Sequence, residues 1–197
     1  MEQKKEIAVI RNIACASRNS ALKCLLAFLC ALPAHTQTQS HPTVQQVEAA
    51  YLYNFAKFIQ QPSSSQPDGS PVTICAMGGD DFDRVLSRTI SGQTIDGRPV
   101  RSKNVKTKDD VQTCTILFVS DSAIDRVAGL WTNLRSHSVL TVSDAPDFLK
   151  RGGMIQFELI DNRVRFEVNI DAARSADVQL SSELLKVALN IVEKPKS

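Results

Sequence analysis

The segment MIQFELIDNRVRFEVNI, residues 154–170, decides the fold of this 197-residue chain. Two apolar-rich runs, 154–160 and 163–170, flank Asp161-Asn162, a two-residue turn of the kind that β-hairpins prefer. The second run alternates: Val164, Phe166, Val168 and Ile170 face one side, and Arg163, Arg165, Glu167 and Asn169 face the other. This alternation predicts an antiparallel hairpin with one covered face and one face in water.

Strands and helices alternate around this hairpin. Apolar runs predict further strands at 72–77, 98–105, 113–120 and 139–144, and helical spacing predicts helices at 44–61, 80–90, 122–135 and 180–192. The early strand–helix–strand order favours parallel pairing, to which the hairpin adds an antiparallel pair. We therefore predict the α/β class, with a single domain at residues 44–193. Its mixed β-sheet of about six strands is flanked by helices and includes the C-terminal antiparallel hairpin.

The stretch VEAAYLYNFAKFIQQP, residues 47–62, holds both tyrosines of the chain. Apolar side chains recur there at helical spacing, after Thr43 as N-cap and before Pro62 as the stop: Val44, Val47, Tyr51, Phe55 and Phe58. The spacing predicts that this stripe is mainly core and not a surface made for a partner. Tyr53 and Lys57 lie off the stripe and are predicted to face solvent or a partner.

The first 34 residues have the pattern of a secretion signal. Scattered basic residues precede CLLAFLCALPA, residues 24–34, a run of about ten apolar residues that suits a signal peptide and is too short to span a bilayer. We expect a signal peptide at 1–34, a disordered linker at 35–43, and export to the periplasm with no membrane insertion after cleavage. An uncleaved membrane anchor is the alternative interpretation.

The charge of the remaining chain argues against nucleic-acid binding. Residues 1–34 hold five of the 23 basic residues and two of the 21 acidic ones, which leaves 18 basic against 19 acidic residues, a net charge of −1. A nucleic-acid-binding domain normally carries a clear basic excess.

Cleavage would leave two of the five cysteines, Cys75 and Cys114, each within a predicted inner strand. An even pair in an oxidising compartment favours a disulfide. It would close a loop of about 40 residues and contribute about 3–4 kcal/mol by chain entropy. Two buried free thiols are the alternative. Cys75 lies late in its strand and Cys114 early in its own, so a simple parallel register does not align them.

Residues that carry catalysis or bind metal are scarce. His137 is the only histidine beyond the leader and its flank, which leaves little for a metal cluster or a histidine-based triad. The sequence GGDDF, residues 78–82, lacks the third glycine of a dinucleotide loop, and its aspartates would repel a phosphate. We expect no catalytic residues, no metal and no cofactor, and a hydrolase is disfavoured because no activated nucleophile is visible.

The polar face of the hairpin offers charges of both signs. Such a face is most often simply solvated, and it is equally suited to docking another protein. The candidate partner-binding residues are Arg163, Arg165, Glu167 and Asn169.

Several motifs together resemble the YfiR family of periplasmic proteins. The match runs from about Val44 to Val192 and is carried by VEAAYLYNFAKFIQQP, VTICAMG with its sequel DDF, CTILFVS, LTVSD, and GGMIQFELIDNRVRFEVNIDAA followed by SSELLKVA. The resemblance implies a mixed sheet flanked by helices, a homodimer and no enzymatic activity. Cys75 and Cys114 match the family's cysteine pair. Some members carry a second pair flanking GGM, where this chain has Leu149 and Gln156.

The resemblance also implies a function. Family members repress an inner-membrane diguanylate cyclase of YfiN type by binding its periplasmic sensing domain, which lowers cyclic di-GMP and biofilm formation, and redox or envelope stress releases the cyclase. The alternative is a periplasmic small-molecule-binding sensor that acts on another membrane receptor or kinase. Its pocket is expected at the carboxyl ends of the strands, near Gly78, Ser120 and Ser143.

Overall fold

The computed structural model describes residues 41–62 and 69–193. The predicted signal peptide and most of the predicted linker at 35–43 lie outside the described residues. Residues 41–43 are exposed and have no regular secondary structure. Across the two described ranges, no helix combines the length and the apolar character that crossing a bilayer requires.

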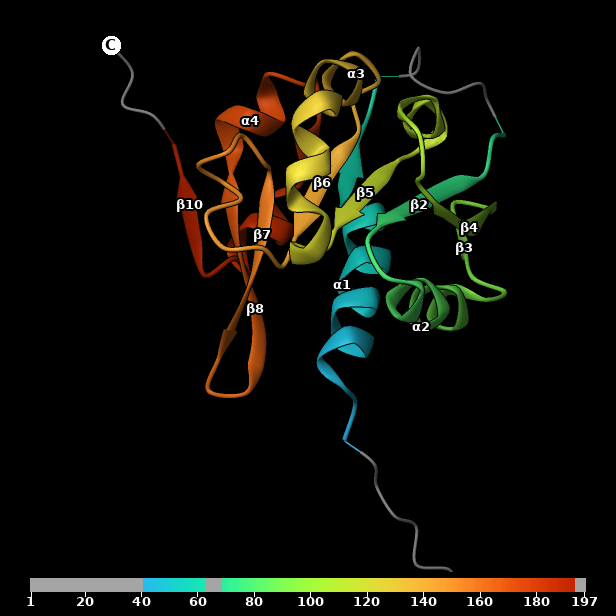
Figure 1. The fold of residues 1–197 in the computed structure, drawn as a ribbon, viewed down its shortest axis with the longest axis horizontal. Coiled ribbons are helices and arrows are strands. Elements are labelled where there is room, and N and C mark those ends of the chain that lie inside the picture. Colours follow the sequence, from blue (N-terminus) through green and yellow to red (C-terminus); the bar gives the residue numbers. More distant parts are fainter. Residues whose placement is uncertain (1–40, 63–68, 194–197) are drawn as a thin grey trace, which may run out of the picture. The chain divides into compact units, whose positions relative to one another are not determined.

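Eight strands form one mixed sheet, which contains all six strands that the sequence predicts (Figure 1). The six are β2 (Val72–Met77), β4 (Arg98–Asn104), β5 (Ile116–Val119), β6 (Leu140–Ser143), β7 (Ile155–Ile160) and β8 (Arg163–Asn169). Two short edge strands, β3 (Thr94–Ile95) and β10 (Asn190–Val192), complete the order β10-β8-β7-β6-β5-β2-β4-β3. The predicted α/β class is confirmed, with eight strands in the sheet in place of about six.

The pairing directions follow the predicted plan. Strands β4, β2, β5, β6 and β7 are parallel to one another, whereas β7 and β8 are antiparallel. The central strands β2, β5 and β6 are buried along their whole length, as expected for parallel strands with both faces covered. Asp161 and Asn162 both have positive φ, 49° and 58°, which is the backbone of the tight hairpin turn that the sequence predicts.

Helices cover both faces of this sheet. One face carries α1 (Val44–Phe58), α2 (Asp80–Ile90), α4 (Ile170–Arg174) and α5 (Ser182–Lys186), whose buried residues belong to one core with Ile74, Ile116 and Phe118. The other face carries the 3₁₀ helices η2 (Lys108–Thr113) and η3 (Asp121–Leu130) with α3 (Trp131–Ser136), which pack on Cys75, Leu117 and Val119. Neighbouring residues of one strand therefore enter opposite cores. In Figure 1 the helical run of η3 and α3 passes in front of β6, with α3 at its labelled upper end.

Helix α1 begins at its predicted cap. Oγ1 of Thr43 accepts the N–H of Gln46 at 3.3 Å, and the Gln46 side chain accepts the N–H of Thr43 at 2.8 Å. The predicted stripe is core only in its middle, because Val44 and Phe58 at its ends are 38% and 40% exposed. Phe55 is buried, and its ring centroid lies 4.9 Å from that of Phe166 on β8.

The prediction that Tyr53 and Lys57 face solvent holds for Lys57, which is exposed, and only in part for Tyr53. Tyr53 is half-buried, and its hydroxyl donates to Oε1 of Gln93 at 3.1 Å. Nζ of Lys57 lies 4.0 Å from the centre of the Tyr53 ring, a distance typical of a cation–π contact. The Tyr53 hydrogen bond therefore holds α1 against the segment between α2 and β3, and Lys57 packs on the Tyr53 ring.

Two predicted helices are wrong in part. The helix predicted at 180–192 ends after the five residues of α5, which Ser181 caps. The chain then extends into β10, because the open edge of β8 offers hydrogen bonds: the N–H of Leu189 donates to the carbonyl oxygen of Phe166 at 2.8 Å. The helix predicted at 122–135 is mainly the 3₁₀ helix η3, followed by the short α3. A separate two-stranded sheet joins β1 (Ile59–Gln60) to β9 (Gln179–Leu180).

Candidate functional site

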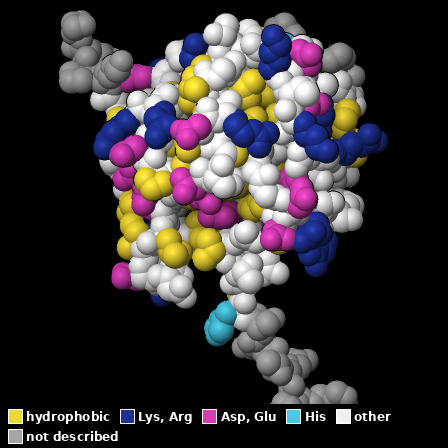
Figure 2. All heavy atoms as spheres, viewed as in Figure 1, with side chains coloured by type: hydrophobic (Ala, Val, Ile, Leu, Met, Phe, Trp, Pro, Cys, Tyr) yellow, Lys and Arg dark blue, Asp and Glu magenta, His cyan; other side chains and the backbone are white. Residues whose placement is uncertain are grey.

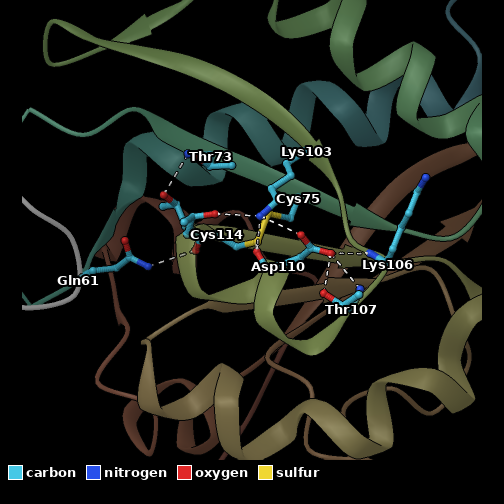
Figure 3. The surroundings of a disulfide bond; sticks show 10 residues. Gln61, Thr73, Cys75, Lys103, Lys106, Thr107, Asp110 and Cys114 are labelled. Carbon is cyan, nitrogen blue, oxygen red and sulfur yellow. Dashed lines mark hydrogen bonds and ion pairs between the residues drawn. A yellow bond between two sulfur atoms is a disulfide. The ribbon is translucent and has the colours of Figure 1, made fainter.

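Cys75 and Cys114 form a disulfide that ties β2 to the segment entering β5 (Figure 3). Their Cα atoms are 5.7 Å apart, and both side chains are buried in the core beneath η2 and η3. Cys114 does not lie within β5, because it ends η2 and the strand begins at Ile116. The register of the parallel strands is therefore no obstacle: Leu117 is the neighbour of Cys75 in β5, and Cys114 reaches Cys75 from the turn before that strand.

Lys103 lies beside Cys75, and Asp110 lies beside Cys114. The Cα atom of Lys103 pairs with that of Cys75 across β4 and β2. Nζ of Lys103 donates to the carbonyl oxygen of Asp110 at 3.0 Å and forms an ion pair with Oδ1 of the same residue at 3.2 Å. That carbonyl oxygen also lies 3.4 Å from Sγ of Cys114. Figure 3 shows the resulting cluster around the two sulfur atoms.

The Asp110 carboxylate fixes the geometry of η2. The backbone N–H groups of Thr107 and Lys106 donate to it at 2.9 and 3.1 Å, and with Lys103 they hold the pKa of Asp110 well below its usual range. An ionised Asp110 thus caps η2, the helix that ends at Cys114. It also pairs with Lys103, which lies beside Cys75.

The β7–β8 hairpin presents its polar side chains in rows across the two strands. From the turn inward, Ile160 is opposite Arg163, Glu158 is opposite Arg165, and Gln156 is opposite Glu167. Arg163 and Arg165 are exposed, and within the described part of the chain neither guanidinium has an ion-pair partner. Figure 1 shows the turn of the hairpin projecting beyond the rest of the sheet.

A cavity of about 580 Å³ lies at the inner end of this polar face. Asp147 and Lys150, from the loop before β7, form one wall, and Val192 of β10 forms another. Its carboxylates outnumber its cations: Asp147, Glu158, Glu167 and Asp171 line it together with the single Lys150. Figure 2 shows acidic and basic side chains crowded on the face where β7, β8 and β10 lie.

The four predicted partner-binding residues do not form one cluster. Arg163 and Arg165 lie at the projecting end of the hairpin, whereas Glu167 and Asn169 line the cavity. Asn169 has a local role, because its Oδ1 accepts the N–H of Ala172 at 3.0 Å as the cap of α4 and its Nδ2 donates to the Leu149 carbonyl at 3.3 Å. Glu167 is half-buried, and in the described chain it has no hydrogen-bond or ion-pair partner.

The residues named for the predicted ligand site at the carboxyl ends of the strands make close contacts within the protein. Ser120 occupies the space beside Gly78, where an added Cβ would lie 2.0 Å from the serine Oγ. Ser143 is buried, and its hydroxyl donates to the carbonyl of Val119 at 2.6 Å. Gly78 and Ser120 are therefore in close contact, and the Ser143 hydroxyl is hydrogen-bonded within the protein.

Glu48 lies near this edge and is a residue that the sequence analysis missed. It is 5% exposed, and burial raises its pKa to about 7, with the Asp144 carboxylate adding to the shift. Its position four residues before Leu52 and seven before Phe55 places it on the buried side of α1, which is the signal that identifies it.

Residues 41–62 and 69–193 contain no group of three or more His, Cys, Asp and Glu side chains that could hold a metal ion. His137 is half-buried at the end of α3, where its Nδ1 lies 2.8 Å from the carbonyl oxygen of Asn133. The same Nδ1 lies 3.1 Å from the hydroxyl oxygen of Ser136, its neighbour in the sequence, so the contacts of this histidine are local to the end of the helix.

The chain matches the sequence profile of the proteins described as YfiR/HmsC-like over residues 45–189. It belongs to the YfiR/HmsC-like family. The YfiR/HmsC-like family consists of periplasmic regulators associated with diguanylate cyclases, and it is a regulatory family and not one of enzymes. Among curated proteins, none matches the chain.

One solved structure shares the fold with this YfiR/HmsC-like chain. A conserved domain protein from Vibrio cholerae O1 biovar El Tor is 9% identical and superposes with a TM-score of 0.50, over 78% of this chain and 62% of that protein. This chain therefore spans less than two thirds of that structure. An ABC domain from Streptococcus pneumoniae, solved with L-Trp, is 12% identical with a TM-score of 0.42, over 61% of this chain and 55% of that one.

The positions at which some YfiR-like proteins are expected to carry a second cysteine pair are joined here by a hydrogen bond. The N–H of Leu149 donates to Oε1 of Gln156 at 3.2 Å, and both residues are 8% exposed. The loop that walls the cavity is thus held to β7 by a bond that oxidants and reductants do not change.

Proposed function

We propose that this chain is an exported, non-enzymatic repressor of an inner-membrane diguanylate cyclase of YfiN type. In this proposal the signal peptide at 1–34 is cleaved, and the mature chain binds the periplasmic sensing domain of the cyclase. Binding lowers cyclic di-GMP and, through it, biofilm formation. The observation that carries the proposal is the family match over residues 45–189.

The polar face of the hairpin supports a role in binding. Arg163 and Arg165 are exposed at its projecting end and have no ion-pair partner in the described chain, so a partner can engage them without breaking existing pairs. Arginine suits such contacts because its planar guanidinium binds a carboxylate through two hydrogen bonds. We assign the contact with the cyclase to Arg163, Arg165, Glu167 and, through its position, Asn169.

Repression follows from differential affinity. A repressor that binds the inactive form of the sensing domain more tightly than the active form shifts the cyclase toward the inactive form. A shift from mostly active to almost fully inactive requires a difference of about 10⁴-fold in affinity. The Cys75–Cys114 bond supports this function by keeping the chain folded, and its reduction weakens the repressor and releases the cyclase.

The test is the level of cyclic di-GMP in cells that contain both proteins. Deleting the gene for this chain should raise cyclic di-GMP, and the wild-type chain should restore the low level. Arg163→Glu/Arg165→Glu should fail to restore it, whereas Arg101→Glu, an exposed arginine on β4, should succeed. An unchanged cyclic di-GMP level after deletion would contradict the proposal.

A sensor of small molecules is the second candidate, and the cavity beside Glu167 favours it. The volume of about 580 Å³ falls within the range of small-molecule sites, about 300–1,000 Å³. A thermal-shift screen of periplasmic metabolites separates the two functions. A ligand that stabilises the wild type but not Glu167→Gln would support the sensor function. If no compound stabilises the chain, protein binding is the function that remains.

A further inference from the structure

The edge of the large sheet at β4 is open along much of its length. Strand β3 pairs only with Arg98 and Pro99, and the N–H of Val100 donates to the carbonyl oxygen of Gln93 at 3.0 Å. Beyond that point the described chain places no strand outside β4. Figure 1 shows β3 and β4 together at one side of the molecule. Residues 101–104 of β4 therefore present a free edge.

The pairing with β2 fixes which backbone groups of β4 point to this open edge. The N–H of Val105 donates to the carbonyl oxygen of Ala76 on β2 at 2.8 Å, so the odd-numbered residues point toward β2 and the even-numbered residues point away. Val100 agrees with this alternation, because its N–H bonds the segment outside β4. Ser102 and Asn104 thus direct their backbone N–H and C=O groups outward, where the described chain offers them no partner.

Unpaired cations border the open edge on one face of the sheet. Arg101 points to the same face as Lys103, whose Nζ contacts η2, and Lys106 and Lys108 follow β4 at the entry to η2. Arg126 of η3 lies beside them, with its Nη2 3.5 Å from the carbonyl oxygen that follows β4. Apart from Lys103, these cations are exposed and have no ion-pair partner in the described chain.

Carboxylates near this edge are fewer than the cations. Asp110 is already paired with Lys103, which leaves Asp109 as the carboxylate of η2 without an ion-pair partner in the described chain. Asp83 of α2 lies on the opposite face of β4, where its carboxylate accepts a hydrogen bond from the Asn104 side chain. The η2 side of the open edge therefore keeps a positive excess. Figure 2 shows Lys and Arg side chains at the right margin of the molecule, where β3 and β4 lie in Figure 1.

An open edge with unpaired cations beside it selects the strands that it accepts. A neutral or apolar strand that paired with β4 would partly bury these cations without a counter-charge, which is how lysines at sheet edges prevent aggregation. A strand with carboxylates on the η2 side avoids this penalty, because each carboxylate lies near a free ammonium or guanidinium group. Backbone pairing then supplies affinity, and the cations determine which partner binds.

We propose that the open edge of β4 binds an extended acidic segment of another protein. The segment adds a strand outside β4 through the backbone of Ser102 and Asn104, and it directs carboxylates toward the cations on the η2 side. Four strands separate β4 from β8, so this edge lies about 24 Å from the polar face of the hairpin. The chain can therefore hold this segment and a partner on the hairpin together, and the inference does not depend on the cyclase.

The test is amide hydrogen exchange, followed by NMR, on the full chain as it is purified from the periplasm. The probe is a short peptide of alternating valine and glutamate, blocked at both ends, and the matched probe has lysine in place of glutamate. In the free chain the amides of Ser102 and Asn104 should exchange fast, and that of Lys103, which bonds β2, slowly. The acidic peptide should slow the two fast amides by about tenfold or more, and the lysine peptide should not. Added salt should weaken the binding.

Variants separate the backbone contact from the charges. Ser102→Pro removes an outward N–H at a position where an edge strand tolerates proline, and it should weaken binding of the acidic peptide by about fivefold or more. Ser102→Thr keeps the N–H and should bind like the wild type. Lys106→Glu should also weaken binding by about fivefold, because it replaces an attraction with a repulsion. Its matched control is Lys186→Glu, an exposed lysine on α5, which should bind like the wild type.

Melting curves of each variant separate a lost contact from a lost fold. If Ser102→Pro does not fold, Lys106→Glu and the exchange rates of the wild type decide the question. The inference is overturned if the acidic peptide does not bind, if it binds without slowing the amides of Ser102 and Asn104, or if the lysine peptide binds as tightly. It is also overturned if these amides become slow in the free chain as its concentration rises, because a second copy then occupies the edge.

Discussion

The backbone N–H of Leu149 donates to Oε1 of Gln156 across 3.2 Å, and Nε2 of Gln156 donates in turn to Glu158. One buried glutamine thus joins the loop at 147–152 to the polar face of the hairpin. This loop forms a wall of the cavity, and the Gln156 side chain holds it together with Asn169, whose Nδ2 donates to the Leu149 carbonyl.

Gln156→Leu should lower the free energy of unfolding by about 1–3 kcal/mol, because it leaves the buried N–H of Leu149 without an acceptor. Urea denaturation measures the loss. The matched control is Gln45→Leu on the exposed side of α1, which should change the stability by less than about 0.5 kcal/mol. Equal stabilities of the two variants would show that the bond does not hold the loop.

The disulfide should stabilise the chain chiefly through its unfolded state. It spans 39 residues of sequence. Cys75→Ser/Cys114→Ser should therefore lower the free energy of unfolding by about 3–4 kcal/mol. Wild-type protein unfolded in the presence of a dithiol reductant should match the variant. A variant as stable as the oxidised wild type would contradict both the stabilising role and the release by reduction.

Glu48 should make the stability depend on pH. Its pKa is about 7 in the folded chain, against a model-peptide value of 4.5. The folded state therefore holds the proton more tightly, so stability is full below about pH 4.5 and falls as pH rises toward 7. The loss amounts to about 3 kcal/mol at pH 8, at 1.36 kcal/mol for each pKa unit.

Glu48→Gln removes this titration. Urea denaturation at pH 5 and pH 8 should find the variant close to the wild type at pH 5 and more stable than the wild type at pH 8, by up to about 3 kcal/mol. If the difference between the two proteins is the same at both pH values, the buried carboxyl does not control the stability.

The longer elements of the fold could be predicted because their patterns are long. The hairpin shows alternation along seven residues of β8 and a turn sequence with positive φ, and β2 is a continuous apolar run. Edge strands β3 and β10 have only two and three residues, too few for a period to appear. The prediction of a helix at 180–192 was wrong in its second half. There the chain pairs with the free edge of β8, and these hydrogen bonds favour a strand over the helix that the apolar spacing of Leu189 and Val192 suggests.

The candidate site could be predicted in its residue types and not in its arrangement. Alternation identified Arg163 and Glu167 as solvent-side residues, but the wall that turns one end of the face into a cavity comes from a loop with no periodic pattern. The Lys103–Asp110 pair beside the disulfide depends on η2, whose capping box of Thr107 and Asp110 the sequence analysis did not use.

The most direct test of the central claim is binding of the purified chain to the purified periplasmic domain of the diguanylate cyclase from the same cells, followed by calorimetry. The account predicts a complex for the wild type and for Arg101→Glu, and at least tenfold weaker binding for Arg163→Glu/Arg165→Glu. Absence of a complex with the wild type, or equal binding by the charge-reversed hairpin, would contradict it.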